Sequence, residues 1–123
     1  MPLDLNKLRA AKKQPKVIDP VEIFRRLPKE VDIKDLYGSQ VEVLNAWFAD
    51  RAKPDHVVKL HTGGGKTLVG LLMAQSIINE TGEPVVFICP NNHLVGQTLR
   101  KAAEYNIPAV GYDKPFPALR RNL

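Results

Sequence analysis

The feature that most constrains this chain is a glycine-rich run between two apolar segments, Leu60-His61-Thr62-Gly63-Gly64-Gly65-Lys66-Thr67. A phosphate-binding loop has this layout: an apolar strand, a glycine turn, a Lys-Thr pair and then a helix. Glycines let the backbone bend so that its N–H groups point inward at a phosphate chain. The following helix adds the positive end of its dipole. The alternative is a glycine turn that binds nothing, and the Lys-Thr pair together with both flanking segments favours the phosphate loop.

Each position of this loop has an expected role. Lys66 reaches the β- and γ-phosphates, and the Thr67 hydroxyl holds Mg²⁺. The backbone expected to surround the phosphates belongs to Thr62, Gly63, Gly64 and Gly65. The loop departs from the general pattern G-x-x-x-x-G-K-[ST] at one position, because Leu60 replaces its first glycine. Small-molecule kinases and GTPases usually keep that glycine. The form found here resembles motif I of superfamily-two helicases and the related restriction-enzyme translocases.

A second motif follows the apolar run Val85-Val86-Phe87-Ile88-Cys89. Residues 90–97 resemble motif Ia of the DEAD/DEAH-box and related helicases, P-x-x-x-L-x-x-Q, with matches at Pro90, Leu94 and Gln97. The proline ends a strand, and Asn91 or Asn92 can cap the next helix. The resemblance implies that this helix start touches a nucleic-acid backbone, a contact without sequence information. The residues expected there are Pro90, Asn91, Asn92 and Gln97; an ordinary strand-to-helix loop is the alternative.

A weaker element lies upstream of the loop. Ser39, with Glu42 three residues on, reads as a capping box that opens an amphipathic helix running to about Arg51. Helicases of this superfamily carry a glutamine about here, and its amide reads the adenine edge. By this resemblance Gln40 would read the base and Tyr37 would stack on it. A glutamine that merely faces solvent in the first helical turn is the other interpretation, and the sequence leaves both open.

The order of elements predicts the fold class. Strands are expected at residues 57–60, 85–89 and 107–112, with helices near 20–27, 40–51, 66–79 and 91–106. Strands that alternate with helices favour an α/β fold with a parallel sheet. The resemblance implies an incomplete RecA-like P-loop lobe, a parallel sheet with flanking helices. We therefore expect a basic flexible tail at residues 1–18. Residues 19–123 are then the N-terminal portion of a helicase ATP-binding domain, truncated before the Asp-Glu motif.

Charge and composition narrow the class of protein. The chain of 123 residues has a formal charge of +5, and residues 1–16 hold five basic side chains against one acidic. Such an arm can attract nucleic-acid phosphate, although a solvated terminus is the usual explanation. The single cysteine, Cys89, excludes a disulfide framework within the chain. No apolar stretch reaches the roughly 18 residues of a membrane span, so a cytoplasmic protein is expected.

The acidic residues limit the expected chemistry. These helicases need an Asp-Glu pair and arginines from a second lobe to hydrolyse ATP, and no two acidic residues adjoin in this chain. We therefore assign no catalytic residue and leave open whether the chain is an enzyme.

The resemblance implies ATP and Mg²⁺ as cofactors. It implies DNA or RNA as partner, together with the rest of a helicase or a partner chain that completes the sheet. The predicted function is the ATP- and nucleic-acid-binding part of a DEAD/DEAH-box-type helicase or translocase that does not hydrolyse ATP alone. A non-enzymatic binding module derived from such a lobe is the alternative. A P-loop kinase is a third, against which Leu60 and residues 90–97 both speak.

Overall fold

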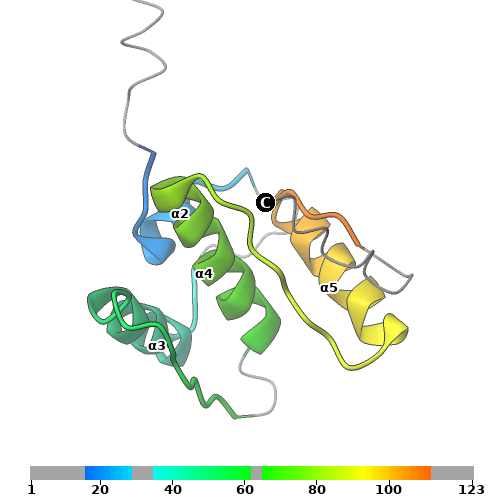
Figure 1. Ribbon diagram of the computed structural model, residues 1–123, viewed down its shortest axis with the longest axis horizontal. Helices are drawn as coiled ribbons and strands as arrows, with labels where there is room; N and C mark the ends of the chain where they lie inside the picture. The colour runs from blue at the N-terminus through cyan, green and yellow to red at the C-terminus, as the bar shows by residue number, and fades with distance from the viewer. Residues whose placement is uncertain (1–15, 29–34, 62–64, 112–123) are drawn as a thin grey trace, which may run out of the picture.

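The computed structural model describes residues 16–28, 35–61 and 65–111, and these ranges form four helices (Figure 1). The helices are α2 (Pro20–Arg26), α3 (Gly38–Ala49), α4 (Lys66–Thr81) and α5 (Asn92–Glu104). All four were expected from the sequence, each within a few residues of these bounds. The predictions made for the tail at residues 1–15, for loop residues 62–64 and for residues 112–123 lie outside the described residues.

Local signals in the sequence set most of the helix ends. The Asp19 carboxylate accepts a hydrogen bond from the Val21 N–H at 2.9 Å, so it caps α2. Gly82, with a φ of 74°, ends α4 in the left-handed conformation that glycine tolerates. The predicted Ser39 cap is wrong, because α3 begins at Gly38, two residues before the predicted start, and its N-cap is Tyr37. One half of a capping box is present two residues earlier than predicted: the Gln40 side chain accepts a hydrogen bond from the Tyr37 N–H.

The predicted parallel sheet and α/β class are also wrong for the part of the chain that the structure describes. Residues 57–60, 85–89 and 107–111 form no strand. No backbone hydrogen bond joins one of these described segments to another. A strand gains its hydrogen bonds only from a neighbouring strand, and here the segments meet helices instead. Residues 57–59 line a hollow with Trp47 of α3, and the Phe87 ring lies against Gly70 of α4.

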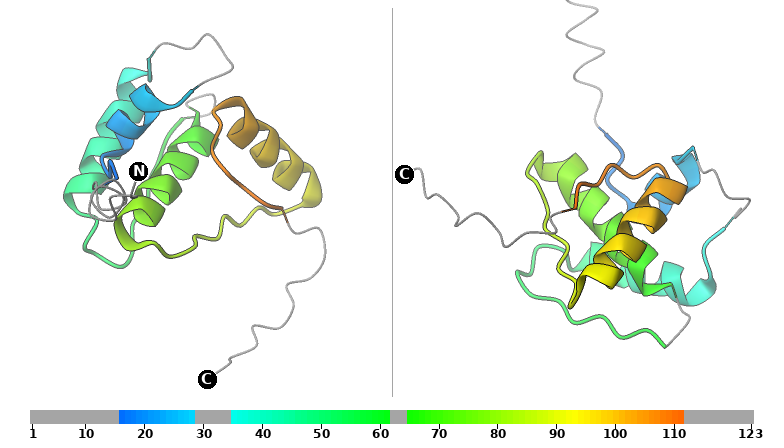
Figure 2. Two further views of the ribbon diagram at one scale, coloured as in Figure 1. Left: turned by 90° about the horizontal axis from the view of Figure 1, so that it is seen from above. Right: turned by 90° about the vertical axis from the view of Figure 1, so that its right-hand side faces the viewer.

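The core lies around α4, which has α2 and α3 on one side and α5 on the other (Figures 1 and 2). Phe24 of α2, Leu44 of α3 and Leu72 of α4 are fully buried, with 0% of their surface exposed. The centroid of the Phe24 ring lies 5.8 Å from that of Tyr105, the residue after α5, which belongs to the same core. Burial of these apolar side chains, at about 25 cal/mol per Å² removed from water, is the main force holding the helices together.

Helices α4 and α5 run side by side in the same direction, so both begin at the same end of the molecule (Figures 1 and 2). The segment between them returns along the helices from the end of α4 to the start of α5. Its contacts are the Phe87 ring against α4 and the Cys89 Sγ, which lies 3.5 Å from the Thr98 Oγ1 of α5. No helix in the described ranges is long and apolar enough to cross a membrane.

Candidate nucleotide and nucleic-acid site

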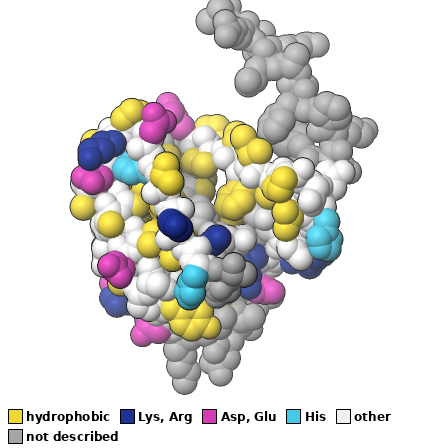
Figure 3. Space-filling model, turned by 90° about the horizontal axis from the view of Figure 1, so that it is seen from below, with side chains coloured by type: hydrophobic (Ala, Val, Ile, Leu, Met, Phe, Trp, Pro, Cys, Tyr) yellow, Lys and Arg dark blue, Asp and Glu magenta, His cyan; other side chains and the backbone are white. Residues whose placement is uncertain are grey.

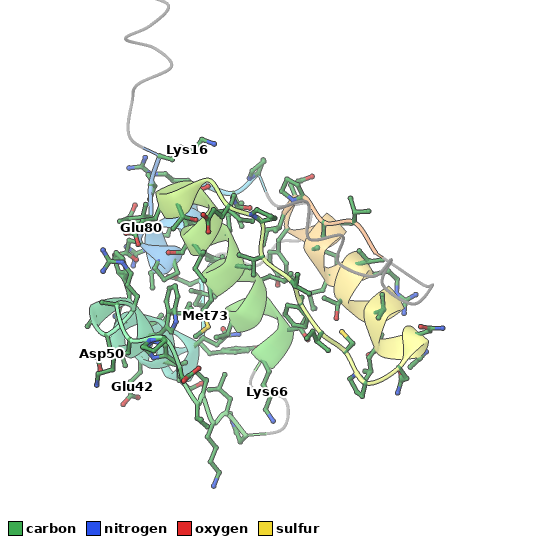
Figure 4. The ribbon with its side chains drawn as sticks, viewed as in Figure 1. Lys16, Glu42, Asp50, Lys66, Met73 and Glu80 are labelled. Atoms are coloured by element: carbon green, nitrogen blue, oxygen red, sulfur yellow. The ribbon has the colours of Figure 1, made fainter. Side chains whose placement is uncertain are left out.

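The start of α4 differs from the starts of α2 and α5. Its N-cap is Gly65, which has a φ of 74° and no side chain to accept a hydrogen bond, and the first turn holds no acidic residue. By contrast, Asp19 caps α2 and Asn91 caps α5 with side-chain oxygens. Lys66 is exposed and its side chain extends away from the helix end (Figure 4). A helix start whose N-cap has no side chain, a helix dipole and a lysine at one point form an arrangement suited to an anion.

Gln40 lies beside this helix start and is buried, with 3% of its surface exposed. Its Oε1 accepts a hydrogen bond from the Tyr37 N–H at 2.9 Å. Its Nε2 donates to the Gly65 carbonyl at 3.3 Å. The interpretation of Gln40 as a solvent-facing residue is therefore wrong. Tyr37, in contrast, has 69% of its surface exposed and is free to meet a ligand.

The surface around the start of α4 is basic. Lys59, His61 and Lys66 are all exposed, and among the described residues no ion pair engages either lysine. Figure 3 views this end of the molecule, with Lys and Arg side chains near the middle and acidic side chains around the rim. The described ranges hold no cluster of His, Cys, Asp or Glu able to bind a metal by itself. Thr67 can supply one hydroxyl oxygen, so Mg²⁺ there would take its other ligands from phosphate and water.

The start of α5 carries the second predicted site. The four residues expected to contact nucleic acid are all exposed, namely Pro90, Asn91, Asn92 and Gln97. The Asn91 Oδ1 accepts from the Leu94 N–H at 2.9 Å, which confirms one of the two expected caps. The Gln97 amide lies 3.3 Å from the His93 ring, so these two side chains form one polar surface a helical turn long.

Arg100 was not predicted from the motifs, and it extends this polar surface of α5. A Cβ added at Gly96 would lie 3.8 Å from an Arg100 guanidinium nitrogen, so the side chain lies back toward the helix start. Among the described residues Arg100 has no acidic partner, whereas its neighbour Lys101 pairs with Glu104 at 3.4 Å. The spacing in the sequence could have indicated this residue, because residue 100 lies three positions after Gln97 and therefore on the same helix face.

The structure brings some predicted site residues together and leaves others apart. Tyr37, Gln40 and Gly65 are joined by hydrogen bonds, and Lys66 and Thr67 follow directly in the first turn of α4. The predicted loop residues Thr62, Gly63 and Gly64 lie outside the described ranges. The exposed start of α5 is a separate surface at the same end of the molecule (Figure 1).

Comparison with protein families places the chain among helicase-like proteins. In particular, residues 33–112 match the family described as type III restriction enzyme, res subunit. The match covers about two thirds of the chain and includes both motifs, and the chain belongs to this family. The expected kinship with superfamily-two helicases and restriction-enzyme translocases is thereby confirmed. Comparisons with curated proteins and with solved structures give no match.

Proposed function

We propose that the chain is the ATP- and nucleic-acid-binding part of a cytoplasmic ATP-dependent helicase or translocase acting on DNA or RNA. The observation that carries the proposal is the uncapped start of α4. It lies directly after a glycine run, within a matched helicase-type family. An anion is the natural partner of such a helix start, and the family generally uses ATP with Mg²⁺.

In this proposal each residue at the α4 start has one task. Lys66, exposed and without an ion pair among the described residues, binds the β- and γ-phosphates. The Thr67 hydroxyl is a Mg²⁺ ligand, and the Gly65 conformation turns the chain into the helix. Tyr37 stacks on the adenine, a task that its exposure supports. The bound metal ion would neutralise phosphate charge.

The nucleic acid is proposed to bind at the start of α5 through its phosphates. The Leu94 N–H already donates to the Asn91 Oδ1. In this proposal the phosphates are therefore bound by side chains and not by that N–H group. Asn92 and Gln97 offer neutral donors, and Arg100 adds a positive charge to the same face. Contacts of this kind position a protein on a strand without reading its sequence.

A protein partner is proposed for the apolar segments that the helices leave exposed. Val57 is 100% exposed, Val86 is 62% exposed and Ile88 is 82% exposed. Exposed aliphatic side chains of this kind support a covering protein surface. The remainder of a helicase, or a partner chain that takes its place, is the proposed cover.

Titration of the purified chain with ATP and Mg²⁺ in a calorimeter tests the nucleotide site. Lys66→Ala should weaken binding by about tenfold or more, because it removes a charge-assisted contact to phosphate. Lys16→Ala is the matched control: it removes the same charge at the opposite end of α4 (Figure 4) and should leave binding unchanged. Equal affinity of wild type and Lys66→Ala would contradict the proposal.

Hydrolysis separates the proposed binding function from its alternatives. We expect no steady ATP turnover from this chain alone, since the Asp-Glu motif and second lobe that the family uses are not in the sequence. A non-enzymatic nucleic-acid-binding module would bind nucleic acid without binding ATP. Turnover abolished by Lys66→Ala would instead show a competent enzyme and overturn the expectation.

A further inference from the structure

The contact between Gln40 and Gly65 links two elements that are far apart in sequence. Gln40 lies in the first turn of α3, and its Nε2 donates across 25 residues to the Gly65 carbonyl at 3.3 Å. The same carbonyl accepts the first hydrogen bond of α4, from the Val69 N–H at 3.2 Å. The carbonyl before Lys66 therefore has two donors, one from each helix.

This contact determines where a backbone donor points. The Gly65 carbonyl and the Lys66 N–H belong to one planar trans peptide, in which C=O and N–H point in opposite directions. Holding the carbonyl toward α3 and α4 therefore holds the Lys66 N–H outward from the helix start. A bound phosphate would lie on that outward side.

The packing around Gly65 supports the same conclusion. A Cβ added at this residue would lie 2.1 Å from the Gln40 Nε2 and 3.2 Å from its Cδ. The φ of 74° independently favours glycine. Gln40 thus fills the space beside Gly65 and is itself held by the Tyr37 N–H, so that the amide has little freedom to turn.

We propose that Gln40 is a positioning residue for the phosphate site: it orients the Gly65–Lys66 peptide so that the Lys66 N–H faces the phosphates. The proposal rests on the proposed function and deepens it. It differs from the role that the resemblance implies, in which the Gln40 amide reads the adenine edge. The Oε1 and the Nε2 of that amide each already have a protein partner, and only 3% of the surface of Gln40 is exposed.

Two ligands distinguish positioning from base reading. ATP carries a base and phosphates, whereas inorganic tripolyphosphate carries the phosphates alone. Gln40→Met keeps the length of the side chain and suits a buried site, but removes both hydrogen bonds. If Gln40 positions the phosphate site, the variant should weaken ATP and tripolyphosphate by the same factor, about three- to tenfold for a lost hydrogen bond. Calorimetric titration with Mg²⁺ present measures both.

A companion variant and a control complete the test. Gln40→Glu retains an acceptor for the Tyr37 N–H and loses the donor to Gly65, so it should weaken both ligands alike. Gln75→Met makes the same change as the first variant on α4, where Gln75 donates to Asn79 at 2.8 Å. This control should leave both affinities unchanged. Weakened ATP with unchanged tripolyphosphate would assign Gln40 to the base, and no change in either would leave it without a role; both results overturn the proposal.

A second measurement keeps the proposal separate from the proposed function. If the wild-type chain binds neither ligand, the nucleotide site itself fails. The orientation of the peptide is still tested by NMR, where Gln40→Met should shift the Lys66 amide proton and Gln75→Met should not. An unmoved Lys66 amide in the Gln40 variant overturns the positioning role whatever the ligand data show.

Discussion

Helices α4 and α5 start at the same end of the molecule and each follows an apolar segment, but their first turns are completed differently. At α4 the N-cap is Gly65 without a side chain, and the neighbouring Gln40 holds its carbonyl. At α5 the N-cap is Asn91, whose own side chain accepts the Leu94 N–H. The N-cap of α4 satisfies none of the first N–H groups of its helix, whereas the N-cap of α5 satisfies one of them.

The two helices also differ in their surroundings. Helix α4 lies against α2, α3 and α5, whereas among the described helices α5 lies against α4 alone. Four apolar residues of α4 are buried, but in α5 only Ala102 is. Similar sequence contexts, an apolar run followed by a helix, therefore produce a central helix with a glycine N-cap and a peripheral helix with an asparagine N-cap.

The largest expected effect tests the difference in packing. Leu72→Ala removes a fully buried side chain from α4 and should lower the free energy of unfolding by about 2–5 kcal/mol. Leu99→Ala, in a half-buried position of α5, should cost clearly less. Urea unfolding followed by circular dichroism measures both variants. Equal losses would mean that α5 belongs to the core as fully as α4 does.

A pair of glycine substitutions should act in opposite directions. Gly65→Ala meets both a positive φ and the Gln40 side chain, so it should destabilise the fold by about 1–3 kcal/mol. Gly96→Ala lies inside α5, with its nearest neighbour at 3.8 Å, and should stabilise by about 0.5–1 kcal/mol through helix propensity. Thermal unfolding of the two variants gives the signs. A stabilising Gly65→Ala would break the contrast between the two helices.

Removal of the α5 cap should have a smaller and local effect. Asn91→Ala leaves the Leu94 N–H without its acceptor and should cost about 1 kcal/mol. Hydrogen exchange should speed up in the first turn of α5 and remain unchanged in α4. Asn91→Asp keeps the acceptor oxygen and serves as the control. Faster exchange in α4 as well would show that the two helix starts are coupled.

The smallest effect concerns the end of α5 and appears only at alkaline pH. Burial raises the pKa of Tyr105 above its ordinary value of 10.0, and the nearby Lys101 opposes this. Above pH 10 the unfolded chain loses this proton first, so unfolding becomes more favourable. The free energy of unfolding should therefore fall as the pH rises above 10.0, and this fall should end once the pH exceeds the pKa of Tyr105 in the folded state.

Tyr105→Phe tests this origin of the alkaline loss. The variant should remove that part of the decline in unfolding free energy that sets in as the pH rises above 10.0. Tyr37→Phe, at an exposed tyrosine, should leave the decline in place. Urea unfolding at several pH values measures the slope, and an unchanged slope in Tyr105→Phe would assign the loss to other groups.

Particular residues show which parts of the fold could be predicted from the sequence. Asn91 was predicted correctly as a helix cap, because capping depends on neighbours within a few residues. Val57–Leu60 and Val85–Cys89 carry strand-like composition, yet the described segments form no sheet, since a strand needs a partner that composition does not supply. The contact of Gln40 with Gly65 spans 25 residues, and no local pattern indicated it.

The sequence by itself determined the positions of the four described helices and the family to which the chain belongs. Helical hydrogen bonds close over four residues, so composition and caps suffice to place them. Three features were decided only by the tertiary structure. The apolar segments pack against helices, α5 is peripheral, and the Gln40 side chain donates a hydrogen bond to the Gly65 carbonyl. These three features depend on contacts between residues far apart in the sequence. Burial and long-range hydrogen bonds stabilise such contacts, and no short stretch of sequence contains both partners.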